Sequence, residues 1–288
     1  MATGTQEHID ATTADIFLEE TWSKTAIVAR NQSTVHAELV NRVYENDAKI
    51  GDLVHIPARS HLTVQSKSRT ANAATIFETV TETNTDITIG TWEYQGVAIE
   101  TATEKQVNRD LLEFYAPEQG YALGLSVDDV LAGLVDDFTQ IVGTLAVELT
   151  YEDLLRADQY ENDANAPLDG RVITVSPAQR AGFLKMDQFI HNDYSKLNEG
   201  ISKAGKNAYL GTWMGTYGVY MSTNVEGTNS AGHDNGMFQK DALALVMQMK
   251  ATTHKQFDIN YLTTKVVVEH LFGTGELRDD HGVWMKGA

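Results

Sequence analysis

The chain has 288 residues, with 22 basic against 40 acidic side chains and a formal net charge of -18. Such a charge argues against a protein that wraps nucleic acid, because binding to phosphates requires clustered Lys and Arg. The lack of cysteine excludes a disulfide framework, thiolate catalysis and cysteine-based zinc sites. No long apolar run is present, and residues 1–17 lack the basic and apolar regions of a leader, so we expect no membrane span and no signal peptide.

The first predicted elements lie within residues 13–40, which read as a short helix followed by a partly extended segment. Thr13 and Asp15 are both suitable N-caps for this helix.

A long basic hairpin is predicted next. From residue 51 apolar and polar residues alternate, as in a strand, and the alternation returns over residues 75–94. The small, polar stretch between these limbs is typical of an exposed tip, and each limb of about 12 residues would reach roughly 40 Å. Arg59, Lys67 and Arg69 lie on this excursion, with no acidic residue between Asp52 and Glu78. We therefore expect the hairpin to need support from outside its own core.

A long acidic helix is predicted at residues 106–138, where apolar residues recur at spacings of three and four. Pro117 is expected to kink or interrupt it, because proline removes a backbone donor. Residues 110–170 carry fourteen acids against one base, Arg156. Within the helix, the adjacent pairs point to different faces and are better interpreted as solvated or interface charges than as acid–base dyads: Asp128, Asp129, Asp136 and Asp137.

The second half predicts an α/β unit followed by a returning sheet. Thr150 caps one expected helix, and Ser176 with Pro177 opens another after the strand 171–176. A turn is expected at residues 232–237, "GHDNGM". Three C-terminal strands should follow, at residues 241–251, 263–277 and 282–287.

The search for chemistry gives only weak signals. Gly200–Asn207 fits a phosphate-binding loop except that Asn207 replaces the Ser or Thr that holds magnesium, and its flanks favour a surface loop. Gly273 begins "GTGELR", which lacks the third glycine of a dinucleotide fingerprint and is more simply a turn. His270 and His281, with Asp279 and Asp280, favour a solvated turn over a metal site. We expect no cofactor.

The order of elements resembles the major capsid proteins of tailed bacteriophages, which have the Hong Kong 97-type capsid fold. The resemblance covers nearly the whole chain, from "IFLEETWSKTAIVARNQSTVHAELVNRVYENDAKIGDLVHIPARSHLTV" through "RVITVSPAQRAGFLK" to the end. It lies in element order and sequence texture, with no short diagnostic motif.

This resemblance implies an α+β fold divided as follows: N-terminal arm 1–48; extended E-loop hairpin 49–90; P-domain 91–142 and 238–288, with spine helix 106–138; inserted α/β A-domain 143–237. Some members of the family crosslink through a Lys and an Asn or remove an N-terminal scaffold. We carry neither activity over, because no crosslinking pair is recognisable and the short N-terminal segment is expected to leave no room for a scaffold.

As to function, the resemblance implies a non-enzymatic coat protein that assembles in the host cytoplasm, as hexamers and pentamers, into the icosahedral shell of the virion. Scaffolding and portal proteins would be its partners, with a decoration protein as a further candidate, and the shell would enclose DNA without sequence-specific binding. Arg59, Lys67 and Arg69 of one subunit would lie across the acidic spine and A-domain surface of the next. Acidity elsewhere on the inner wall would keep packaged DNA from adhering.

Two alternatives remain open from the sequence. A non-viral encapsulating shell of the same fold would differ in lacking genomic DNA inside its particles. A soluble nucleotide-dependent enzyme using Lys206 would differ in binding ATP tightly.

Overall fold

The computed structural model describes residues 34–58, 62–67, 69, 74–75, 77–79, 83–106, 111–186 and 208–288. Every described residue belongs to one compact unit, residues 31–288. Arg59, the helix predicted near Thr13 or Asp15 and the loop 200–207 lie outside the described residues.

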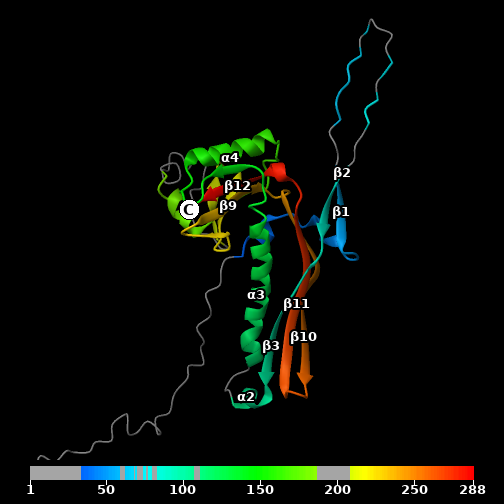
Figure 1. Cartoon of the computed structure of the whole chain (residues 1–288), viewed down its shortest axis with the longest axis vertical. Helices are drawn as coiled ribbons and strands as arrows, with labels where there is room; N and C mark the ends of the chain where they lie inside the picture. The colour runs from blue at the N-terminus through cyan, green and yellow to red at the C-terminus, as the bar shows by residue number, and fades with distance from the viewer. Residues whose placement is uncertain are drawn as a thin grey trace, which may run out of the picture. The chain divides into compact units, whose positions relative to one another are not determined.

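The described part combines helices with three sheets (Figure 1), which confirms the predicted α+β class. The helices are α1 His36–Leu39, α2 Thr101–Gln106, α3 Leu111–Gly133, α4 Tyr151–Asp163 and α5 Pro177–Phe183, with 3-10 turns at Val43–Asn46 and Asp279–His281. The strands are β1 Leu53–Ala58, β2 Thr83–Thr88, β3 Thr91–Glu100, β4 Ile141–Gly143, β5 Arg171–Val175, β6 Tyr209–Trp213, β7 Tyr217–Met221, β8 Gly227–Thr228, β9 Gly232–Gln239, β10 Leu243–Asp258, β11 Thr263–Glu276 and β12 Gly282–Gly287.

A three-stranded antiparallel sheet, in the order β10, β11, β3, packs against α3 (Figure 1). Ser126 Oγ of α3 donates to Glu93 Oε2 of β3 over 2.6 Å, and Gln119 Nε2 donates to the carbonyl of Val266 in β11 over 3.4 Å. These contacts fix which face of the sheet the helix covers.

The helix differs from its prediction at its C-terminal end and at Pro117. The described helix α3 runs from Leu111 to Gly133, so it ends five residues before the predicted end at 138. It ends in a tight turn, with the amide of Leu134 bonded to the carbonyl of Leu131. Pro117 lies inside α3 without breaking it; its side chain is exposed, so the proline ring projects toward water instead of into the packed face. No described helix is both long and apolar enough to cross a membrane.

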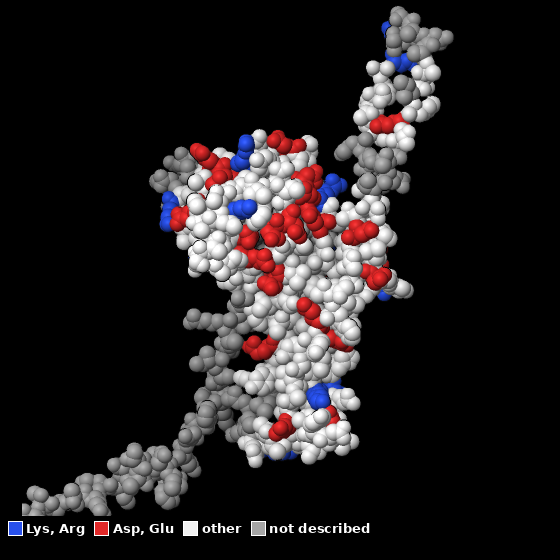
Figure 2. Space-filling model, viewed as in Figure 1, with Lys and Arg blue, Asp and Glu red and all other residues white. Residues whose placement is uncertain are grey.

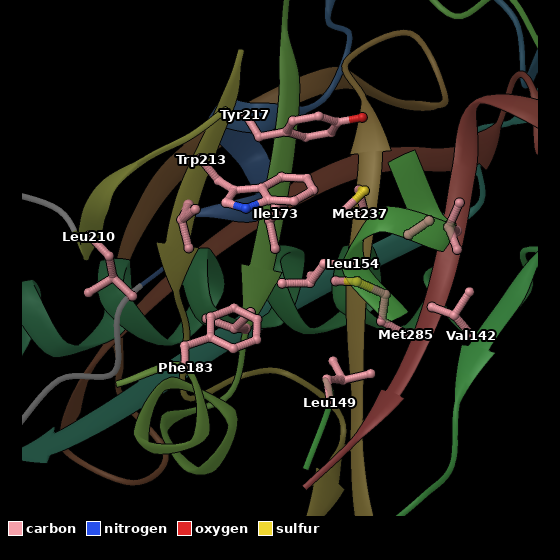
Figure 3. Close-up of a cluster of buried hydrophobic side chains, with 14 residues drawn as sticks. Val142, Leu149, Leu154, Ile173, Phe183, Leu210, Trp213, Tyr217, Met237 and Met285 are labelled. Atoms are coloured by element: carbon pink, nitrogen blue, oxygen red, sulfur yellow. The ribbon is translucent and has the colours of Figure 1, made fainter. Parts of the chain in front are cut away.

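The larger sheet has the order β4, β12, β9, β5, β7, β6, with β8 paired to β9. Its core is built by aromatic and aliphatic side chains that include Trp213, Tyr217 and Phe183, drawn from strands and from α4 and α5 (Figure 3). The last strand, β12, pairs with β9 and β4. Residues 282–287 therefore share this sheet with residues 141–143 of β4 and with β9, a long-range pairing that local pattern does not reveal.

Local capping chemistry is confirmed. Thr150 caps α4, accepting from the amide of Asp153 while the Asp153 carboxylate accepts from the Thr150 amide over 2.8 Å. Ser176 caps α5, and its hydroxyl accepts from the amide of Gln179 over 3.0 Å. Pro177 is the first helical residue, where its missing N–H costs nothing.

Two predicted turns are wrong, because glycine serves close packing there. Residues 232–237 lie in β9, between β12 and β5, where a side chain at Gly236 would press on Val135. Gly273 lies inside β11, and a side chain there would collide with the carbonyl oxygen of Thr88. The chain needs glycine at this point because β11 passes directly beneath the end of β2.

The base of the hairpin is anchored. β1 and β2 pair antiparallel from Leu53 opposite Thr88 to Ala58 opposite Thr83. Ile87 is buried with Ala244 and Val246 of β10 in a small apolar cluster. Paired strand is thus confirmed near the body, but residues 62–67 are not part of any strand.

Candidate subunit interface

The segment between β1 and β2, residues 59–82, is called the hairpin arm here. Residues 62–67 are all exposed, and the two limbs contact each other where the Thr63 amide donates to Glu78 Oε2 over 2.8 Å. Three large apolar side chains of the arm lie in water, with exposed fractions of 65% for Leu62, 98% for Val64 and 89% for Phe77. Lone exposed apolar residues are ordinary, but three on the two limbs of one hairpin arm are typical of a binding surface.

The basic residues predicted to carry the interface lie on this arm where they are described. Lys67 and Arg69 are exposed, and none of the hydrogen bonds or ion pairs found among the described residues involves either of them. Their charges are therefore available to another molecule.

A continuous acidic surface lies around the end of α3 (Figure 2), and we call it the acidic patch. Burial and the charges of Asp137 and Asp234 raise the pKa of Asp136, and burial with the charges of Asp136 and Asp234 raises the pKa of Glu226. Such mutual repulsion shows that the carboxylates are close together without enough cations to neutralise them. The patch consists of Asp129, Asp136, Asp137, Glu226, Asp234, Glu276 and Asp279.

Glu276 and Asp279 form the edge of the acidic patch. Burial and the neighbouring Asp279 raise the pKa of Glu276 to about 7. Burial alone would raise the pKa of Asp279, but hydrogen bonds from the hydroxyl and amide of Thr139 and from Glu276 outweigh it and lower that pKa. The amide of Thr139 donates to Asp279 Oδ1 over 2.8 Å. As the pH falls toward neutral, Glu276 is therefore the carboxyl of this pair that takes up a proton first.

Asp128 does not belong to this surface, which corrects its prediction as an interface charge. It is fully buried; its Oδ1 accepts from the amide of His36 over 2.7 Å, and its Oδ2 accepts from Asn224 Nδ2 over 2.9 Å. Burial would raise the pKa of Asp128, but the hydrogen bond and charge of His36 and the bond from Asn224 lower it. Asp128 ties α1, α3 and the segment before β8 together.

Of the predicted acidic residues, the structure brings Asp129, Asp136 and Asp137 into one patch. Sequence analysis missed Glu226, Asp234, Glu276 and Asp279, which reach it from distant segments. Only their acidity was visible in the sequence, and nothing local predicted their convergence.

A second set of charges is enclosed within the seven-stranded sheet and α4. Arg171 is 2% exposed, and its guanidinium lies 3.3 Å from Asp158 Oδ1 and 3.2 Å from Glu161 Oε2. It also donates to the Tyr217 hydroxyl over 2.7 Å and to the carbonyl of Ala166 over 2.7 Å. Burial raises the pKa of Glu161 to about 7 despite Arg171. This network joins α4 to β5 and β7.

Histidines with acidic neighbours do not form a metal site in the described part of the chain. His270 Nε2 lies 3.1 Å from Glu93 Oε2 in the three-stranded sheet, whereas His281 is 3.9 Å from Asp280 in the turn before β12. Among the described residues, no group of three or more His, Cys, Asp or Glu is arranged to hold a metal ion.

Solved structures share this arrangement over nearly the whole chain. A structure from Mycobacterium phage Che8 has a TM-score of 0.79 at 22% identity, covering 93% of this chain and 97% of its own. The capsid of the Cyanophage P-SCSP1u has a TM-score of 0.75 at 16% identity, covering 99% and 95%. The fold is that of a phage capsid protein.

The mature capsid of bacteriophage PhiM1 is also similar, with a TM-score of 0.68 at 12% identity, covering 93% of this chain and 90% of that one. The predicted Hong Kong 97-type capsid fold is thereby confirmed. No family model and no curated protein matches the sequence.

Proposed function

We propose that this chain is the major capsid protein of a tailed phage and that its copies assemble into the icosahedral shell enclosing the genome. Similarity to capsid structures over 93–99% of the chain supports this, because it extends over arm, helix and both larger sheets. The subunits would form hexamers and pentamers.

The single observation that carries the proposal is the apolar character of the hairpin arm. Leu62, Val64 and Phe77 are exposed, and full burial of each would contribute roughly 1.5–3 kcal/mol. A shell buries such an arm against a neighbour and repeats the contact in every hexamer and pentamer, so that the modest binding free energies of single contacts add up.

Charge fixes how the arm docks. Arg59, Lys67 and Arg69 of one subunit would lie over the acidic spine and A-domain surface of the next, with Lys67 and Arg69 at the acidic patch beside Asp129, Asp136 and Asp137. The raised pKa values within the patch support this, because incoming cations would relieve a repulsion already present in the free subunit. Such complementarity gives register and specificity more than affinity.

The remaining roles follow from the shell. The chain would act without turnover, reside in the virion after assembly in the host cytoplasm, and cooperate with scaffolding and portal proteins; a decoration protein is a further candidate partner. Its net charge of -18 would keep enclosed DNA from adhering without any sequence-specific contact. We propose the N-arm, E-loop, P-domain and A-domain division given above, with residues 282–287 moved to the A-domain sheet.

Two measurements test this proposal: electron microscopy of the purified chain, and a test for DNA protected inside particles that have been treated with nuclease. Closed shells that protect phage DNA when produced in the infected host are the expected result. Closed shells without DNA in that setting would point to a non-viral compartment. A compact monomer that stays monomeric at high concentration in a sedimentation experiment would contradict assembly altogether.

A further inference from the structure

The three-stranded sheet has an open edge. In the order β10, β11, β3, the ten-residue strand β3 pairs with β11 on one side, and no described strand lies on its other side. Alternate residues of such an edge direct their N–H and C=O groups away from the sheet, where they can pair with another chain.

One face of β3 is as exposed as its edge. Trp92 and Tyr94 have exposed fractions of 67% and 72%, and Gly96 and Ala98 follow at the same period of two. Glu93 points to the opposite face, where it accepts the hydrogen bond from Ser126 of α3. The edge therefore offers an aromatic face on the side that the helix does not cover.

The limb 62–67 of the hairpin arm has the matching properties. It belongs to no helix or strand, and all six residues are exposed. Leu62 and Val64 are two residues apart, so in a strand both would project to one face. At about 3.3 Å per residue, six residues span roughly 20 Å, which fits along the ten residues of β3.

Charge distinguishes β3 from the other open edge of the same sheet. β3 contains Glu93 and Glu100 and no Lys or Arg, whereas β10 contains the exposed Lys250 and Lys255 against one acid, Asp258, which is paired with Lys265 of β11. The limb ends in Lys67 and continues to Arg69. A basic strand is therefore attracted to β3 and repelled by β10.

We infer that residues 62–67 of one copy add to the free edge of β3 of a neighbouring copy as a fourth strand, antiparallel to β3. Leu62 and Val64 then contact the face formed by Trp92 and Tyr94. This inference rests on the proposed capsid function and specifies where the arm docks.

The direction follows from the position of the acidic patch. Ser126 lies beside Glu93, so Asp129, three residues further along α3, lies near the beginning of β3. Thr91 pairs with Phe272, and β11 continues from there to Glu276 of the acidic patch. For Lys67 and the tip beyond it to reach the patch, the limb must run opposite to β3.

Disulfide trapping tests this pairing, because the chain has no cysteine of its own. Val64→Cys is combined in turn with Trp92→Cys, Tyr94→Cys or Ala98→Cys, and assembled particles are oxidised and analysed on non-reducing gels. Cβ atoms of residues opposite each other in a sheet lie about 4.5–5.5 Å apart, close enough for a disulfide after small adjustments. All four positions are exposed, so the variants should fold.

The matched control combines Val64→Cys with Thr252→Cys, His254→Cys or Gln256→Cys, exposed positions on the same face of β10. We expect at least one β3 variant to give covalent dimers at no less than tenfold the yield of every β10 variant. Normal particles without β3 crosslinks, or with β10 crosslinks of equal yield, overturn the strand addition and leave the capsid proposal standing. If the wild-type chain forms no particles, the capsid proposal and the pairing both fail.

Discussion

The interior around β5 and the hairpin arm place side chains in opposite settings. Inside, the guanidinium of Arg171 is almost fully buried, with carboxylates, a tyrosine hydroxyl and two backbone carbonyls of the same chain around it. On the arm, Val64 and Phe77 are almost fully exposed. Burying a charge is tolerated only with partners in place, and exposing apolar area is costly unless it is later covered.

The difference indicates which part of the molecule is complete within one chain. The sheet that contains β5 provides all the partners of its buried guanidinium, Arg171, from within the chain. We therefore expect it to fold and remain stable without a neighbouring subunit. The arm is anchored at its base by Ile87 but exposes its apolar groups further out, so a neighbouring copy is needed to bury them. Substitutions in the two regions should therefore separate stability from assembly.

The largest effect is expected from Arg59→Glu, Lys67→Glu and Arg69→Glu together. Each single exposed pair contributes only about 0–1 kcal/mol, but reversal converts attraction to repulsion at every contact of a closed shell. Particles should be lost in electron micrographs while the circular dichroism spectrum is retained.

The matched control is Lys240→Glu, Lys250→Glu and Lys255→Glu, which changes the net charge equally at exposed positions off the arm. It should still assemble. High salt should partly restore the arm variant, because the screening length falls to about 3 Å at 1 M. Normal particles from the arm variant at low salt would rule out electrostatic docking.

Arg171→Met should be the most destabilising of the internal changes. It leaves Glu161 and Asp158 without their cation, and breaking a buried pair costs about 3–5 kcal/mol. The Arg171→Met change is made in the arm variant, which stays unassembled, so that denaturant unfolding measures the free energy of unfolding of single subunits. Arg156→Met, at an exposed position of α4, the helix that carries Asp158 and Glu161, should change the unfolding free energy by less than about 0.5 kcal/mol. Equal effects would mean that the network is dispensable.

Asp128→Ala should destabilise by about 2–4 kcal/mol, since it leaves the amide of His36 and the side chain of Asn224 without an acceptor. Asp129→Ala, one residue along, removes an exposed charge from a repulsive patch and should be neutral or slightly stabilising. The same unfolding assay measures both. A reversed order would show that the buried contact is not structural.

Glu161→Gln should have a smaller, pH-dependent effect. The pKa of this carboxyl is raised from 4.5 to about 7, so the folded state holds its proton more tightly than the unfolded state. Wild-type stability from this group is present below pH 4.5 and is lost as the pH rises to about 7, by up to about 3 kcal/mol. The variant lacks this dependence, so its stability relative to wild type should rise between pH 4.5 and 7 and then level off. A constant difference would refute the shifted pKa.

Much of the fold was predictable from local chemistry. Thr150 and Ser176 cap their helices as predicted because an N-cap depends on residues within one turn. Turns were wrongly predicted at Gly236 and Gly273, because glycine occurs both in turns and at close backbone contacts. Only the tertiary structure distinguishes these two uses of glycine.

Only some of the acidic residues at the candidate interface could be placed from the sequence. The acids of α3 were evident, but helical phase decides which of them are buried. Asp128 precedes Leu131 by three residues and Val135 by seven, the spacing of the buried stripe, and this signal could have identified it. Glu226 and Glu276 could not have been placed, because the convergence of their segments on the end of α3 depends on long-range pairing.

Hydrogen exchange of residues 62–67 in the free subunit and in intact particles is the most direct test of the central claim that the arm is completed by another copy. The amides of this exposed limb should exchange rapidly in the free subunit and be protected at least tenfold in the particle. The amides of β5, already paired on both sides, should be protected in both states. Equal exchange of residues 62–67 in the two states would contradict the claim.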